Sequence, residues 1–322
     1  MVDENERLRA ELRESDRLPF GVARSAAVED LVARADDLND VPLSIAARLH
    51  LMTAYSYGGE PLRRFPVFDW LLARYAEDPE LFDDDNRYRL LWMFKWVTVG
   101  VVEHPAVPLD RIMSGLDDME RHYVDAGQGL APVLSSRFQV LARVQGHAAA
   151  DEAYRRWQDA SRTPLSDCRT CEPALQVWHL AALDRDTEAL TLAFPILEHG
   201  GCADQPQKMI GHALDPLLRL GMSDRAATEH LRGVRLLRER PGSTATWAQH
   251  VQLCARTGRL HRGLDLLEHR LHEVDDAPAP EDAMWLAAAG ARLLRGLEEL
   301  GEGDLPVHEY AIADDGLVPH RA

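Results

Sequence analysis

A repeat of 37 residues is the feature of this sequence that most restricts its fold. Three turn-like segments, each 37 residues after the one before, end in a small residue. They are 183–189, 220–226 and 257–263. A small side chain at that position lets two helices approach closely, and stacked helical hairpins repeat at about this period. The second half of the chain is therefore predicted to be an array of helical hairpins.

Apolar positions keep their phase in this repeat. Three rows of apolar or small residues recur at the 37-residue spacing: Val177, Leu214 and Val251; Leu180, Leu217 and Cys254; Ala181, Leu218 and Ala255. Residues three to four positions apart share one face of a helix, so these rows predict the buried face of the first helix in each hairpin. Cys254 is accordingly expected in the core as a small apolar residue.

Polar and mixed rows recur at the same spacing and predict a second face. In a stack of hairpins the first helices line the concave surface, so this face is a candidate groove for a partner. The candidate binding face consists of Trp178, His212, Asp215, Arg219, Gln249, Gln252 and Arg256. Because these side chains lie outside the core rows, charge reversal at Arg219 and Arg256 is expected to weaken partner binding with little change in melting temperature.

The rest of the chain also reads as helical, because apolar residues follow helical spacing and strand signals are nearly absent. Helices are expected at 3–15, 24–36, 42–56, 66–76, 86–102, 109–125 and 132–145. The predicted fold is all-α, a right-handed α-solenoid. Four segments are expected: N-terminal helices with a capping role (1–64), aromatic-rich hairpins (65–145), the repeats (146–300) and a flexible tail (301–322).

Several segments resemble an uncharacterised, largely actinobacterial group of tetratricopeptide-repeat-like proteins. The resemblance spans about residues 65–275, and its clearest segments are DCRTCEP (167–173), GCADQPQ (201–207) and CARTGRLHRGL (254–264). It implies tetratricopeptide-like hairpins and implies no activity, because a fold presents sites without defining them. Some relatives in the group carry a histidine where this chain has Gln207, next to Pro206.

Charge and apolar runs restrict the partners. With 36 basic and 53 acidic residues, the net charge of −17 opposes binding to nucleic acid. The acidic N-terminal stretch lacks the apolar region of a signal peptide, and the longest mostly apolar run, 90–102, is too short to span a bilayer. We therefore expect a soluble, cytoplasmic protein that binds neither nucleic acid nor membranes, whose cysteines are thiols or metal ligands.

Three cysteines predict a structural zinc site. Cys168 and Cys171 precede one first helix and Cys202 precedes the next, so neighbouring helices would bring their thiols together. Sulfur atoms within about 4 Å of one another would fit zinc, whereas separations above about 7 Å would exclude it. The fourth ligand is expected from His199, Asp204, Gln207 or water. The alternative is that the three thiols are inert and partly buried.

An aromatic stripe formed by Tyr88, Trp92 and Trp96 has two interpretations. Its members follow one another at four-residue spacing, so they share one side of a helix. Such a stripe can anchor a partner peptide or belong to the core.

No nucleophile elbow, phosphate-binding loop, dinucleotide glycine pattern or metal-hydrolase motif is present in the sequence. The sequence therefore predicts a non-enzymatic scaffold that binds a protein or peptide partner in the concave groove. One alternative is a regulatory protein that senses a ligand or peptide. The other is a metal-dependent enzyme whose site is assembled only in space.

Overall fold

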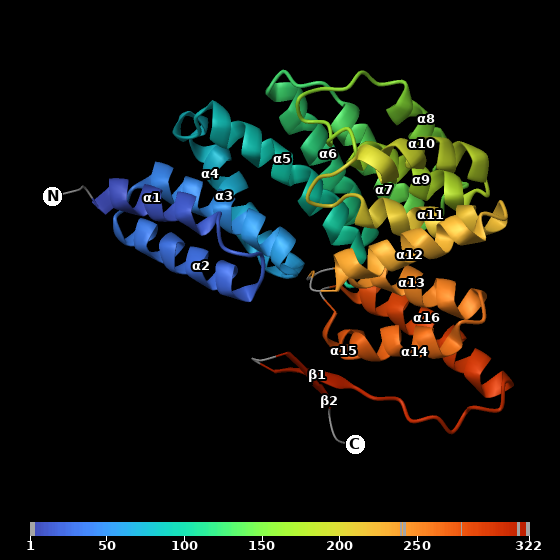
Figure 1. Cartoon of the computed structure of the whole chain (residues 1–322). Helices are drawn as coiled ribbons and strands as arrows, with labels where there is room; N and C mark the ends of the chain where they lie inside the picture. The colour runs from blue at the N-terminus through green and yellow to red at the C-terminus, as the bar shows by residue number, and fades with distance from the viewer. Residues whose placement is uncertain (1–3, 239, 241–242, 278, 314–315, 320–322) are drawn as a thin grey trace. The chain divides into compact units, whose positions relative to one another are not determined.

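The protein is helical and divides into two compact units, Met1–Ser166 and Asp167–Ala322, in a computed structural model (Figure 1). The structure describes residues 4–238, 240, 243–277, 279–313 and 316–319. The division after Ser166 lies beyond the predicted boundary at 145/146, and the four predicted segments remain predictions. Residue 3 of the first predicted helix, and residues 314–315 and 320–322 of the predicted tail, lie outside the described residues.

The first unit begins with helices at all seven ranges that the periodicity predicts. They are α1 (Glu4–Ser15), α2 (Val22–Asp37), α3 (Val41–Gly58), α4 (Arg64–Glu77), α5 (Asp84–Gly100), α6 (Leu109–Asp125) and α7 (Ala131–Gln145). An eighth helix, α8 (Asp151–Gln158), follows, and short 3-10 turns lie at η1 (Pro61–Arg63), η2 (Pro79–Leu81) and η3 (Val101–Glu103). Carboxylates fix two helix starts: Asp40 accepts a hydrogen bond from Leu43 N, and Asp83 accepts one from Asn86 N.

The core of this unit is apolar and rich in aromatic rings, with Phe68, Leu71, Phe94 and Tyr123 buried together. The predicted aromatic stripe lies at the edge of this core. Trp92 and Trp96 are half-buried against it, whereas Tyr88 is exposed and its hydroxyl donates a hydrogen bond to Pro164 O. The stripe is thus neither wholly core nor a free surface, because Trp92 and Trp96 pack against the core while Tyr88 is exposed.

The second unit is a series of three helical hairpins. They are α9 (Cys171–Ala182) with α10 (Asp186–His199), α11 (Gln207–Arg219) with α12 (Ser223–Leu237), and α13 (Thr244–Arg256) with α14 (Leu260–His269). The first helices lie side by side, α11 between α9 and α13 (Figure 1). Gly211 allows the close approach of α11 and α13, because a Cβ there would lie 2.0 Å from the Gln249 side chain.

The turns within the three hairpins have the same backbone conformation. Asp184, Gly221 and Gly258, which are spaced by 37 residues, all have positive φ, at 56°, 74° and 70°. The amide of the next residue then donates to a carbonyl near the end of the first helix: Arg185 N to Leu180 O, Met222 N to Leu217 O and Arg259 N to Cys254 O, at 2.8–2.9 Å. The repeat seen in the sequence is therefore also a repeat of local geometry.

Burial follows the same register. Two of the predicted apolar rows, those that begin with Val177 and Leu180, are fully buried, including Cys254, while the row that begins with Ala181 is half-buried. The small residues at the start of the second helices, Ala189, Ala226 and Gly263, are buried as expected. The 37-residue register thus predicts correctly which side of each first helix faces the core.

The array is followed by the short helix α15 (Glu273–Asp276) and the long helix α16 (Pro280–Glu299), which packs on α13 and α14. Leu286 and Leu293 of α16 are buried against the core of the last hairpin. Two short strands, β1 (Tyr310–Ala313) and β2 (Gly316–Pro319), pair antiparallel near the C-terminus (Figure 1). In the described part of the chain, no helix is both long enough and apolar enough to cross a membrane.

Candidate functional site

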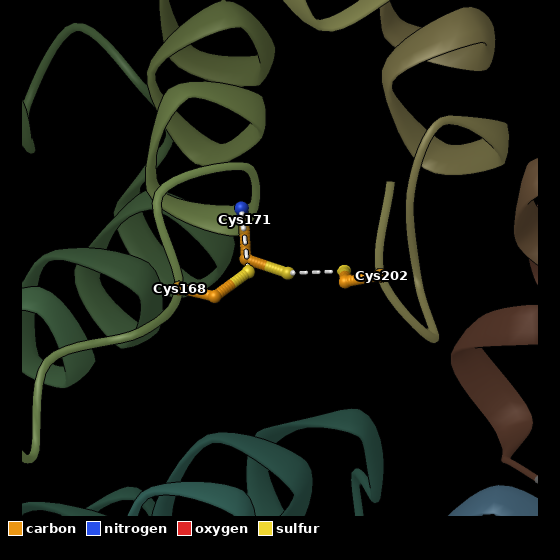
Figure 2. A group of neighbouring side chains, drawn as sticks. All are labelled: Cys168, Cys171 and Cys202. Carbon is orange, nitrogen blue, oxygen red and sulfur yellow. Dashed lines mark hydrogen bonds between the residues drawn. The ribbon is translucent and has the colours of Figure 1, made fainter. Parts of the chain in front are cut away.

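Three thiols converge where the first hairpin of the second unit meets the next. Cys171 is the first residue of α9, Cys168 lies just before it, and Cys202 lies in the loop between α10 and α11. Their sulfur atoms all lie within 4.8 Å of one another, and Cys171 Sγ is 3.5 Å from Cys202 Sγ (Figure 2). The convergence predicted from side-by-side first helices is confirmed.

These distances fit a metal better than a covalent bridge. All three cysteines are free thiols, and 3.5 Å is far longer than the S–S bond of about 2.05 Å. Tetrahedral zinc with bonds of about 2.3 Å holds its sulfur ligands about 3.8 Å apart. The three side chains can therefore hold a thiophilic metal ion with only small movements.

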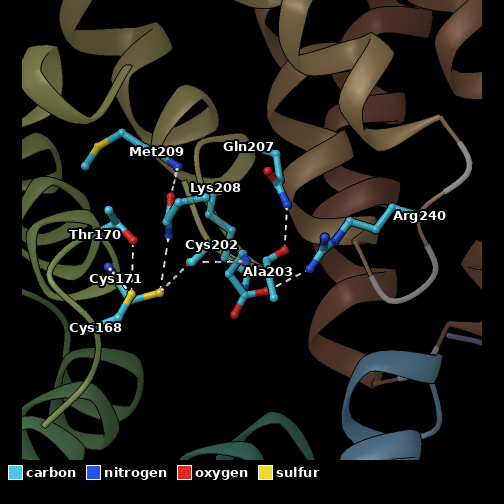
Figure 3. A network of polar contacts seen from close by, with 11 residues as sticks. Cys168, Thr170, Cys171, Cys202, Ala203, Gln207, Lys208, Met209 and Arg240 are labelled. Carbon is cyan, nitrogen blue, oxygen red and sulfur yellow. Dashed lines mark hydrogen bonds and ion pairs between the residues drawn. The ribbon is translucent and has the colours of Figure 1, made fainter. Parts of the chain in front are cut away.

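Each sulfur also has a nearby hydrogen-bond donor. Cys171 N donates to Cys168 Sγ at 3.3 Å, and Asp204 N donates to Cys202 Sγ at 3.4 Å. The amide nitrogen of the buried Gln205 lies 4.0 Å from Cys171 Sγ. Figure 3 shows the surrounding polar contacts, including the one between Thr170 and Cys168. Donors of this kind orient metal ligands and reduce the charge on thiolates.

The thiols differ in how readily they ionise. Burial acts to raise the pKa of Cys168, but hydrogen bonds from the Thr170 hydroxyl and from neighbouring backbone amides outweigh it and lower the pKa. The pKa of Cys171 is raised, mainly by burial and then by the negative charge of Cys202 and Cys168. Since one thiolate disfavours the next, a bound cation would be needed to hold all three in the thiolate form.

Two of the residues expected to supply a fourth ligand, Asp204 and Gln207, make contacts elsewhere, and the third, His199, lies on the surface. Asp204 pairs with Arg240 at 2.9 Å and with Lys208 at 3.4 Å, and the Gln207 side chain donates to Ala203 O. His199 is highly exposed and lies beside Glu198. Among the described residues, no histidine, aspartate or glutamate joins the three thiols as a metal-ligand group.

The candidate binding face lies across α9, α11 and α13. Its residues are half-buried or exposed, and none is buried between hairpins. Two contacts join neighbouring helices along it: the Gln249 side chain lies 3.2 Å from His212 Nδ1, and Arg256 bridges Asp215 at 2.5 Å. The two helices thus hold these polar groups in fixed positions relative to one another.

Arg219 has a structural role that the sequence analysis missed. Its guanidinium pairs with Asp186 on α10 at 2.6 Å and donates to Ala181 O at 2.8 Å. The Asp186 side chain is only 9% exposed, so charge reversal at Arg219 would leave a nearly buried carboxylate facing a like charge. We therefore expect charge reversal at Arg219 to lower the melting temperature. The unchanged melting temperature expected for Arg256, whose partner Asp215 is half-exposed, remains a prediction.

A buried histidine pair also went unpredicted. His230 on α12 and His250 on α13 approach through their Nδ1 atoms at 3.0 Å, and His230 Nε2 lies 3.9 Å from Cys254 Sγ. Burial lowers the pKa of His230 to about 4 and that of His250 to about 3. The two residues are 20 apart and lie on different helices, so no local pattern announces the contact.

Comparison with known proteins adds no assignment: no protein-family model matches the chain, and no curated protein matches it. The resemblance to tetratricopeptide-like proteins therefore remains a prediction, and the function must be inferred from the site itself.

Proposed function

We propose that the second unit is a right-handed α-solenoid of tetratricopeptide-like hairpins that binds a protein or peptide partner on the candidate binding face. The observation that carries this proposal is that burial repeats at equivalent positions of α9, α11 and α13. Equivalent positions in the three helices are buried on one side and left half-exposed on the other. A surface that repeats in this way suits an extended partner, which meets equivalent positions in successive repeats.

The composition of the face supports a polar partner. It combines amide, imidazole and charged groups with the single indole of Trp178, and its cross-helix contacts reduce the side-chain entropy that binding would cost. The partner would approach a protein of net charge −17, so a segment with positive charges would be favoured at long range.

The test uses two double variants with the same change in charge. Gln252→Glu with Arg256→Glu alters the face, whereas Thr228→Glu with Arg235→Glu alters exposed positions on α12. A partner captured from the native host is purified and titrated against both proteins. We expect binding at least about tenfold weaker for the face variant and unchanged for the α12 variant. Equal affinities of the two variants for that partner would contradict the proposal.

We further propose that Cys168, Cys171 and Cys202 hold a structural zinc ion. The ion would tie the start of α9 to the loop before α11 and so fix two successive hairpins relative to one another. Because metal binding to a folded site adds to folding free energy, removing the ion should lower the melting temperature.

Elemental analysis of protein purified without chelator tests the zinc site. We expect about one zinc per chain in the wild type and in Cys254→Ala, because Cys254 lies in the core, and none in Cys171→Ser. A chelator should lower the melting temperature of the wild type and leave that of Cys171→Ser unchanged. Zinc at equal levels in wild type and Cys171→Ser would remove this site.

A further inference from the structure

We propose that the metal ion at this centre has three protein ligands and takes an exogenous thiolate as its fourth. The inference rests on the zinc site of the proposed function and adds to it a class of ligand, small thiols. It concerns only the thiol cluster, and the binding of a partner to the candidate binding face is independent of it.

The first line of support is that neighbouring side chains have their donor atoms engaged elsewhere. Both oxygens of Asp204 face cations, with Oδ1 toward Arg240 and Oδ2 toward Lys208. Gln205 Oε1 accepts a hydrogen bond from Met209 N at 2.9 Å. For Asp204 to become a ligand, two ion pairs would have to break, and Gln205 would have to uncap the first turn of α11.

The second line is the chemistry of the three sulfurs. Thiolates select soft or borderline metals, and zinc strongly prefers four ligands. Structural zinc sites are closed by four protein ligands, whereas sites with three keep one position for a molecule from solution. In the described part of the chain, only Cys168, Cys171 and Cys202 form such a ligand group. The proposed zinc ion would therefore tie the two hairpins together and still keep one position open, as sites of the second kind do.

The third line is access and charge. Cys168 and Cys202 are exposed, so a small molecule can reach an ion held between them. Three thiolates and Zn²⁺ carry a net charge of −1, and a fourth thiolate would make it −2. The backbone amides of Cys171 and Asp204 and the Gln205 side chain spread this charge by donating toward the sulfurs.

The ligand exchange balances without an oxidant. A thiol RSH replaces the metal-bound water, its sulfur forms the bond to zinc with the electron pair of the former S–H bond, and the released proton leaves with water as H₃O⁺. No sulfur changes oxidation state. A metal-bound water that acts as a hydrolytic nucleophile would need a nearby general base. The Asp204 carboxylate does not fit this role, because it forms ion pairs with Arg240 and Lys208.

The experiment uses the full chain with Co²⁺ in place of zinc, because cobalt reports its ligands by absorption. 2-Mercaptoethanol is titrated in, with ethylene glycol as the matched additive that lacks sulfur. We expect the thiolate-to-cobalt charge-transfer band to rise by about one third as three sulfur ligands become four, with no response to ethylene glycol. Cys254→Ala and Asp204→Asn should behave like the wild type, since neither residue is a proposed ligand.

The outcomes separate this inference from the zinc proposal. Cobalt binding that depends on Cys171, with a spectrum that 2-mercaptoethanol does not change, would overturn the inference alone. A cobalt spectrum altered in Asp204→Asn before any thiol is added would also overturn it, because Asp204 would then be the fourth ligand. Absence of Cys171-dependent cobalt binding would overturn both proposals.

Discussion

The buried pair of His230 and His250 joins α12 to α13 through neutral imidazoles. One Nδ1 must carry a proton and the other must accept it, so protonating either ring places a charge in a buried site and disturbs the contact. Nearby cations add to this cost, because Arg262 and Arg259 also lower the pKa of His230. The pair is thus a polar contact that holds only while both rings are neutral.

Acid should therefore destabilise the protein over a defined range. The pKa of each histidine is near 6.5 when unfolded and about 4 or about 3 when folded, so the unfolded chain binds more protons below pH 6.5. Above pH 6.5 the two neutral rings do not lower the free energy of unfolding. As the pH falls toward 4, the free energy of unfolding decreases. Between pH 6.5 and 5 each ring should cost about 2 kcal/mol.

Denaturant unfolding at pH 7 and pH 5 measures this loss. Replacing both rings, as His230→Leu with His250→Leu, should reduce the pH dependence, whereas His199→Ala should not, because His199 is exposed. An undiminished loss of stability in the double variant would show that other groups are responsible.

At this scale the sequence shows residue types and their register but not their partners. The register of the repeat predicts that the three thiols meet and that Cys254 is buried, since both follow from which side of a helix a residue occupies. It does not predict that Arg219 reaches Asp186, 33 residues away, or that Gln205 turns toward Cys171. Those contacts depend on loop conformation and on long side chains, which periodicity does not encode.

The hairpin turns at Asp184, Gly221 and Gly258 are the element on which the repeat depends. Each needs a residue in the left-handed region, which costs a non-glycine residue about 1 kcal/mol or more. Two of the three positions use glycine, and the third uses aspartate, which tolerates this conformation better than most residues.

Substitutions at two of these turns should affect the free energy of unfolding differently. Gly258→Ala should lower the free energy of unfolding by about 1 kcal/mol, because no contact within 4 Å of the added Cβ offsets the backbone cost. Asp184→Gly should leave it unchanged or slightly raised, since relief of backbone strain offsets the loss of its exposed contact with Arg219. Denaturant unfolding of both variants checks these predictions. A free energy of unfolding of Gly258→Ala equal to that of the wild type would show that the turn does not need glycine.

The helices themselves were predictable because each buries one apolar stripe. All seven helices expected in the first unit are present, with ends within two residues of the prediction over the described residues. The short helix α8 was not assigned, since its apolar residues Tyr154 and Trp157 give too few positions to establish a period. The antiparallel strands β1 and β2 were also missed, in a segment expected to be a flexible tail.

At the scale of the whole molecule, the chain contains two units with separate cores. The first is centred on residues such as Phe68 and Phe94, and the second on residues such as Leu214 and Val251. The segment that ends the first unit is fixed to it, because the Lys95 ammonium donates to Leu165 O at 2.7 Å. This contact explains why the first unit extends to Ser166, beyond the boundary at 145/146 expected from the repeat.

Each unit should therefore fold when produced separately. We expect fragments 1–166 and 167–322 to be helical by circular dichroism and to melt cooperatively, because each retains its own buried cluster. A fragment ending at residue 158 should be less stable than 1–166, since it lacks the carbonyl that Lys95 binds. An unfolded 167–322 fragment, with 1–166 intact, would contradict independent folding of the second unit.

The identical turns have a consequence for how such a chain can change its length. Loss of residues 221–257 would join Leu220, after α11, directly to Gly258, before α14. The new turn would keep a glycine at the left-handed position, and the buried and exposed sides of the two helices would keep their register. His230 and His250 lie within that stretch and would disappear together, leaving neither ring buried alone. Duplication or loss of one 37-residue segment would thus keep the backbone conformation of the hairpin turns. The number of hairpins can therefore change without a new type of turn.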